Sequence, residues 1–170
     1  MAKVKIIDNF LEKKQFDFIH EAMMSAWFAW FYNDHITFDD EGERKSKKNH
    51  FQFTHAFYSR YEKSNQYAVI EPIVNKLDCI GLARIKANLG TRTEEHVEHG
   101  YHVDYDNPNL TTAIFYVNTN NGYTQFVDGQ KVKSVANRYI EFNSQELHQG
   151  VSQTDTKSRV AINFNYIKSK

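Results

Sequence analysis

Hydrophobic and polar positions follow a helical period near the start of the chain. Apolar side chains recur at helical spacing in residues 11–31: Phe16, Ile19, Met23, Trp27 and Trp30. This stripe predicts a helix that packs one aromatic face against a sheet. A short strand is expected before it at residues 4–7, and a second helix at about residues 65–77, despite Pro72.

The period changes at about residue 81, where short β-prone runs begin. Polar or glycine-containing breaks such as NTNNG and VDGQ separate them. The runs are LARIKANL, GYHVD, TTAIFYVN, YTQFV, KVKSV, RYIEF and RVAINFNYI. Many short strands with turn signals between them are typical of a sandwich or barrel. We therefore expect one domain over residues 1–170, mainly β with N-terminal helices (α+β), with about 1–80 as helical support and about 81–170 as the β core.

Composition narrows the class of protein. The 170 residues suit a single domain, and the 21 basic residues equal the 21 acidic ones, which argues against a nucleic-acid partner. Cys79 is the only cysteine, so no intramolecular disulfide can form, as expected for a reducing cytosol. No run has the length of a signal peptide or a membrane span, so the expectation is a cytoplasmic protein without a membrane partner. The polar stretch 39–49 is expected to be a loop.

The first candidate metal ligands lie in His102-Val103-Asp104. In a strand, alternate side chains share a face, so a histidine and an aspartate in this spacing converge. His148 is the only later histidine and can supply a third ligand. Two histidines and one carboxylate form the facial triad typical of non-haem Fe(II) oxygenases. A closed structural zinc site usually uses several cysteines, and this chain has only Cys79.

His96-Val97-Glu98 is an alternative pair of the same kind. It lies in the highly charged run TEEHVEHG, which is typical of a loop, whereas His102 and Asp104 close a β-prone run. The later pair is therefore favoured. His99 could lie near the metal, but exposure is the favoured expectation.

Arg159 opens the run that follows His148. Its planar guanidinium matches a carboxylate bidentately, so beside a metal it would bind the distal carboxylate of 2-oxoglutarate. Alone, such an arginine is more often part of a surface salt bridge. The candidate iron ligands earlier in the chain nevertheless favour Arg159 as a residue that binds 2-oxoglutarate.

The order of these motifs resembles the 2-oxoglutarate/Fe(II)-dependent oxygenase superfamily, with its prolyl-4-hydroxylase-like branch as the nearest. The resemblance covers about residues 80–167 and implies a double-stranded β-helix, or jelly roll. It also implies that Tyr116 joins Arg159 on the distal carboxylate. Asn88 corresponds to a polar residue, often tyrosine, near the metal-proximal end of 2-oxoglutarate. NNGYT departs from the usual Gly-Gly-x-Thr hairpin. Related halogenases lack the carboxylate ligand, so Asp104 favours hydroxylation.

The resemblance implies an Fe(II)- and 2-oxoglutarate-dependent dioxygenase. It would hydroxylate a protein side chain or a small molecule and release succinate and CO2. The alternative is a non-catalytic jelly-roll module, cupin- or lectin-like, in which Arg159 binds an anion. A cupin-like metal isomerase or a dioxygenase that does not use 2-oxoglutarate is a third reading. FQFTHAFYSR and the loop 39–49 are the expected lids.

Overall fold

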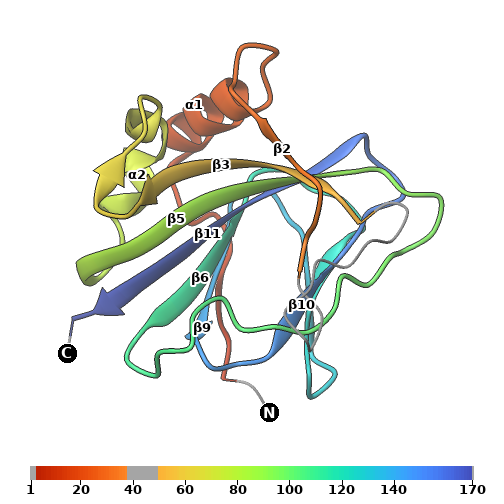
Figure 1. Cartoon of the computed structure of the whole chain (residues 1–170). Coiled ribbons are helices and arrows are strands. Elements are labelled where there is room, and N and C mark those ends of the chain that lie inside the picture. Colours follow the sequence, from red (N-terminus) through yellow and green to blue (C-terminus); the bar gives the residue numbers. More distant parts are fainter. Residues whose placement is uncertain (1–2, 38–49, 170) are drawn as a thin grey trace.

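Two antiparallel β-sheets face one another in the computed structural model, which describes residues 3–37 and 50–169 (Figure 1). Within these residues, the larger sheet has eight strands in the order β1-β9-β6-β11-β5-β3-β2, with β4 paired to β3. Its strands are β1 Lys5–Ile7, β2 Phe31–Asn33, β3 Gln52–Ser59, β4 Glu62–Lys63, β5 Cys79–Thr91, β6 Thr111–Tyr116, β9 Arg138–Asn143 and β11 Ser158–Lys168. The smaller sheet has the order β10-β7-β8, made of β7 Tyr123–Phe126, β8 Lys131–Lys133 and β10 His148–Val151. The chain is thus a jelly roll, as expected.

The helical segments cover the outer face of the larger sheet. They are α1 Lys13–Met23, the 3-10 turn η1 Tyr67–Ile70 and α2 Glu71–Val74. The helix predicted at residues 11–31 is right only for its first half. Ser25 Oγ donates to Ala22 O (2.9 Å) and accepts from Trp27 N (3.3 Å), which offers the backbone a non-helical alternative. Trp27 is therefore 92% exposed instead of packed.

The second predicted helix, at residues 65–77, is broken into η1 and α2. Pro72 lies in the first turn of α2, where its missing N–H costs no helical hydrogen bond. The proline thus marks a new helix start.

The first 80 residues contain strands as well as helices. β3 pairs with β5 inside the larger sheet, so FQFTHAFYSR forms a strand of that sheet and not a lid. GYHVD forms no strand, and β10 was not among the predicted runs. The loop expected at 39–49 lies outside the described residues. No helix in the described residues is long and apolar enough to cross a membrane.

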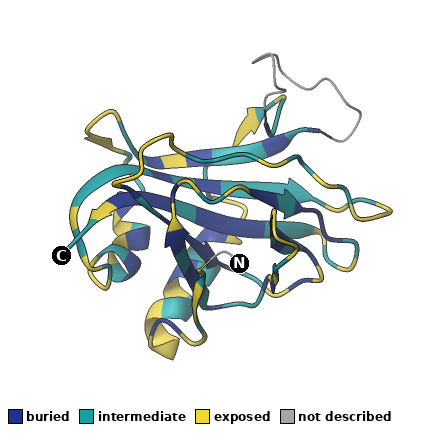
Figure 2. Ribbon diagram, turned by 90° about the horizontal axis from the view of Figure 1, so that it is seen from below, coloured by how far each residue is buried: buried dark blue, intermediate teal, exposed yellow. Residues whose placement is uncertain are grey.

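The central strands β5 and β11 present two different faces. Even-numbered residues of β11 face the helices on what we call the outer face: Val160, Ile162, Phe164 and Tyr166. Most residues of β11 are buried, whereas most of β5 is half-buried (Figure 2). Odd-numbered residues of β11 face the smaller sheet on the inner face: Arg159, Ala161, Asn163 and Asn165. The period of two therefore separates an apolar core from a polar interior.

Candidate metal centre

His102 and His148 are brought together by a single antiparallel bridge. The backbone N–H of His102 donates to His148 O (3.0 Å), and that of His148 donates to His102 O (3.1 Å). Side chains of such a directly opposed pair lie on the same side. The prediction that His102 lies in a strand is wrong, because the chain leaves this bridge immediately and bends at Asp104. The tertiary bridge, and not a regular strand, aligns the two imidazoles.

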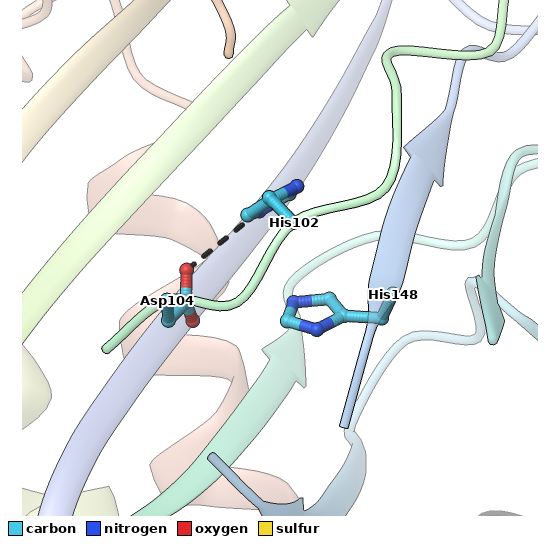
Figure 3. A group of neighbouring side chains, drawn as sticks. All are labelled: His102, Asp104 and His148. Carbon is cyan, nitrogen blue, oxygen red and sulfur yellow. Dashed lines mark ion pairs between the residues drawn. The ribbon is translucent and has the colours of Figure 1, made fainter. Parts of the chain in front are cut away.

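The three predicted ligands converge (Figure 3). Their ligand atoms all lie within 4.8 Å of one another, and His102 Nε2 is 3.8 Å from Asp104 Oδ1. The ring centroids of His102 and His148 are 4.8 Å apart. Figure 3 shows His102 and Asp104 on one segment and His148 entering from β10.

The hydrogen bonds of the two imidazoles fit a cation between them. His102 Nδ1 lies 3.1 Å from Gly100 O, and His148 Nδ1 lies 2.9 Å from Glu146 O. A carbonyl oxygen only accepts, so each proton must be on Nδ1 and each Nε2 carries a lone pair. His148 Nε2 is buried without a hydrogen-bond partner among the described residues. A buried lone pair beside a second imidazole and a carboxylate suits a metal such as Fe(II).

Asp104 is held as a carboxylate by its surroundings. Arg84 Nη2 lies 3.2 Å from Oδ1, while Asn163 and Asn165 donate to Oδ2 at 3.2 and 3.4 Å. Burial by itself raises the pKa of Asp104, but the electrostatic interactions with its neighbours, among them Arg84, outweigh it and the pKa is lowered. The side chain is therefore ionised and oriented for a metal.

Arg159 lies at the other end of the inner face. Its Nε donates to Ser134 Oγ (2.8 Å) and its Nη2 to Thr124 Oγ1 (3.3 Å). Among the described residues, no carboxylate pairs with this buried guanidinium. An unpaired buried cation is costly, so the position suits an anionic ligand.

The ring of Tyr116 lies beside Arg159, but its hydroxyl is linked to the guanidinium only through Thr124. Its hydroxyl donates to Thr124 Oγ1 (2.8 Å), and its ring centroid lies 5.6 Å from the guanidinium carbon of Arg159. Thr124, and not Tyr116, lines the cavity between the sheets. Thr124 and Ser134 escaped the sequence analysis, because only their tertiary contacts with Arg159 distinguish them from other hydroxyl residues.

Gly122 leaves room for the stem of Arg159. A Cβ at this position would lie 2.9 Å from Arg159 Cδ, from Asn120 Oδ1 and from Val151 O. Two of these neighbours are a backbone carbonyl and a buried side chain, which cannot move away freely. The hairpin NNGYT therefore needs its glycine for the arginine beside it.

A cavity of about 110 Å³ joins the two ends of this inner face. Asn88 lines it from β5, and its Oδ1 is buried without a hydrogen-bond partner among the described residues. His99 lines it too, contrary to the expectation that it is exposed. Burial, with Arg159 nearby, lowers the pKa of His99 to about 3, so this imidazole is neutral.

Lys86 also lines the cavity and was missed, although the alternation of Arg84, Lys86 and Asn88 was visible in the sequence. The alternative pair is not part of the cluster. His96 Nδ1 lies 2.6 Å from Ser152 O, and Glu98 is exposed.

Solved structures share this fold at low sequence identity. A 2OG-Fe(II) oxygenase family oxidoreductase from Burkholderia pseudomallei matches with TM-score 0.68 and 13% identity, over 98% of this chain and 86% of that one. A Trichoplax adhaerens prolyl hydroxylase, in complex with a hypoxia-inducible factor peptide, matches with TM-score 0.64 and 13% identity, over 99% and 84%. The non-haem alpha-ketoglutarate-dependent epimerase of nogalamycin biosynthesis matches with TM-score 0.66 and 12% identity, over 98% and 79%. No family model matches the sequence, and no curated protein is similar to it. The similarity establishes the fold.

Proposed function

We propose that this chain, which has the jelly roll of the 2-oxoglutarate/Fe(II) oxygenases, is itself such an oxygenase. In this proposal His102, Asp104 and His148 hold Fe(II), and Arg159 binds 2-oxoglutarate. The observation that carries it is the buried Nε2 of His148, which has no partner among the described residues and faces the other two ligands. A purely structural histidine would have this nitrogen satisfied.

The residues around the ligands hold each of them in one state. Carbonyl groups fix the tautomers of both histidines, and Arg84 with the two asparagines fixes Asp104. Such partners typically change metal affinity by about 10- to 100-fold. They preorganise the ligands before a metal binds.

The far end of the cavity is built for a carboxylate. Thr124 Oγ1 accepts hydrogen bonds from Tyr116 and Arg159, which leaves its own proton free to donate. A carboxylate beside Arg159 would then receive the guanidinium and this hydroxyl, with Tyr116 orienting the threonine. Asn88 would donate its amide nearer the metal, as its resemblance to a polar family position suggests.

Bound Fe(II) and 2-oxoglutarate would supply dioxygen activation, with succinate and CO2 as products. Asp104 completes the ligand set, so hydroxylation of a protein side chain or a small molecule is the proposed outcome. The protein's own contribution is orientation of the co-substrate and exclusion of water.

Anaerobic titration with Fe(II) and then 2-oxoglutarate tests the proposal. The wild type should form the weak visible charge-transfer band of an iron–oxoacid chelate. Arg159→Ala should bind iron normally but need about 10- to 100-fold more 2-oxoglutarate, because it loses charged hydrogen bonds. The exposed Arg92→Ala is the matched control.

The other outcomes of this titration would favour a different function. Iron binding without the band would favour a cupin-like metal protein. Failure to bind iron would favour a non-catalytic jelly-roll binding module.

A further inference from the structure

Lys86 is a cation in the cavity that the metal centre does not use. It lies on β5 in register with Asn163 of β11, and it lines the cavity together with His102 and Asp104. Among the described residues, no hydrogen bond or ion pair engages its ammonium group. Burial lowers the pKa of Lys86, which shows the cost of keeping this charge unpaired.

The neighbouring Arg84 differs from Lys86 because its guanidinium has partners within the protein. Its Nη2 contacts Asp104, its Nε donates to Asn165 Oδ1 (3.2 Å), and its guanidinium carbon lies 5.2 Å from the ring centroid of Tyr105. Asp104 is therefore satisfied by Arg84 and the two asparagines. Lys86 is not needed to orient this carboxylate.

The charges around the cavity do not balance without a further anion. The formally charged residues that line it, within the described chain, are Lys86, Arg159 and Asp104. Asp104 is already paired with Arg84, so Lys86 and Arg159 remain as two positive charges without a carboxylate partner among the described residues. Fe(II) would add two and 2-oxoglutarate would remove two, so the excess is the same in either state. A monoanion beside Lys86 would reduce this excess.

Lys86 lies away from the wall that carries His148. The His148 ring packs 4.9 Å from Phe142 of β9, and two strands, β6 and β11, separate β9 from β5. On the other side of β5 lies β3, whose Gln52 lines the cavity with Phe51 and Ile36. The register of β3 with β5 places Ala56 beside Lys86, so Gln52 and Phe51 lie further along β5, toward Arg159.

We propose that the primary substrate is a small carboxylic acid whose carboxylate binds Lys86 inside the cavity. This inference rests on the proposed oxygenase function for the reaction, but the anion site itself does not require it. Lys86 would fix the acid at one end, so that a carbon–hydrogen bond of its body faces the metal. Specificity for acids over neutral analogues follows from the unpaired charge.

The test compares cyclopentanecarboxylate with cyclopentanecarboxamide, which has the same shape but no charge. Each is titrated by calorimetry into the metal-free protein. Each is also titrated anaerobically into the Fe(II)–2-oxoglutarate complex, where substrate binding shifts the visible band. The variants are Lys86→Met, which keeps length without charge, Lys86→Arg, which keeps charge, and Lys133→Met at an exposed position.

The wild type should bind the acid at least about tenfold more tightly than the amide. Lys86→Met should lose this preference without any change in 2-oxoglutarate affinity, whereas Lys86→Arg and Lys133→Met should retain it. Equal affinity for acid and amide, or no binding of the acid, would overturn the proposal. So would a preference that survives in Lys86→Met, since the acid would then bind the metal or Arg159.

Two outcomes separate this proposal from the oxygenase assignment. If Lys86→Met weakens 2-oxoglutarate instead, the lysine belongs to the co-substrate and the substrate proposal is wrong. If no visible band forms but the metal-free protein still prefers the acid through Lys86, the anion site stands and the oxygenase function fails.

Discussion

The two faces of strands β5 and β11 use the same backbone for opposite purposes. On the outer face, Ile162 and Phe164 are fully buried among apolar side chains. On the inner face, Asn163 lies between them in sequence and donates to Asp104 (3.2 Å). Side chains of consecutive residues point to opposite sides, so one strand can stabilise the fold and orient a proposed metal ligand at once.

Polar groups on the two faces differ in how they are satisfied. The outer-face hydroxyls of Tyr139 and Tyr166 both donate to Glu141 Oε2, at 2.9 and 2.7 Å. Across the cavity, His148 Nε2 and Asn88 Oδ1 are buried without partners among the described residues. Orphaned atoms cost free energy, so their location on the cavity side is what distinguishes a binding interior from a core.

The sharpest test of this comparison substitutes adjacent residues. Phe164→Ala should lower the free energy of unfolding by about 3–5 kcal/mol, because it leaves a cavity in the outer-face core. Urea denaturation measures this change, and the folded variant should bind iron as the wild type does.

Asn163→Ala is its matched partner on the inner face. It should change the free energy of unfolding by only about 1 kcal/mol but weaken iron binding about tenfold. If both variants lose the same stability and bind iron equally, the two faces do not divide these roles.

His148→Ala should have the next largest effect, on metal binding. It removes a proposed ligand, so Fe(II) affinity should fall by more than the roughly 100-fold that even indirect partners contribute. Equilibrium dialysis under anaerobic conditions measures it. Tight retention of iron would contradict the proposed triad.

Gly122→Ala should weaken binding of the co-substrate but not of iron. The added Cβ would displace Arg159 or the Val151 carbonyl, each 2.9 Å away. We expect about tenfold weaker 2-oxoglutarate binding with unchanged iron affinity, and overpacking should cost about 1–3 kcal/mol of stability. Gly81→Ala is the control, because its nearest neighbour, Ile167 Cδ1, lies at an ordinary 3.8 Å. Normal 2-oxoglutarate affinity would show that Arg159 needs no such clearance.

His96→Ala should have the smallest effect. This histidine contacts Ser152 O and lies outside the ligand cluster, so iron affinity should stay within about twofold of wild type. A large loss of iron, measured by the same dialysis, would move the metal to the alternative pair.

The sequence allowed the residues of the candidate metal centre to be named before their arrangement was known. Histidine, aspartate and arginine are chemically distinctive, and their order along the chain resembles a family pattern. The predictions from the sequence that were wrong concern secondary structure. The helix end at Met23, the strand β3 and the irregular segment at His102 all depend on contacts with distant residues.

By itself, the sequence determined which residues of β11 share one face of the sheet, because alternation is a local property of extended backbone. Only the tertiary structure decided which of these residues share one cavity. Lys86, Thr124 and Arg159 come from three strands in two sheets, and their meeting depends on the packing of one sheet on the other. Local periodicity carries no information about such neighbours, since contacts between sheets form only when the whole chain has folded.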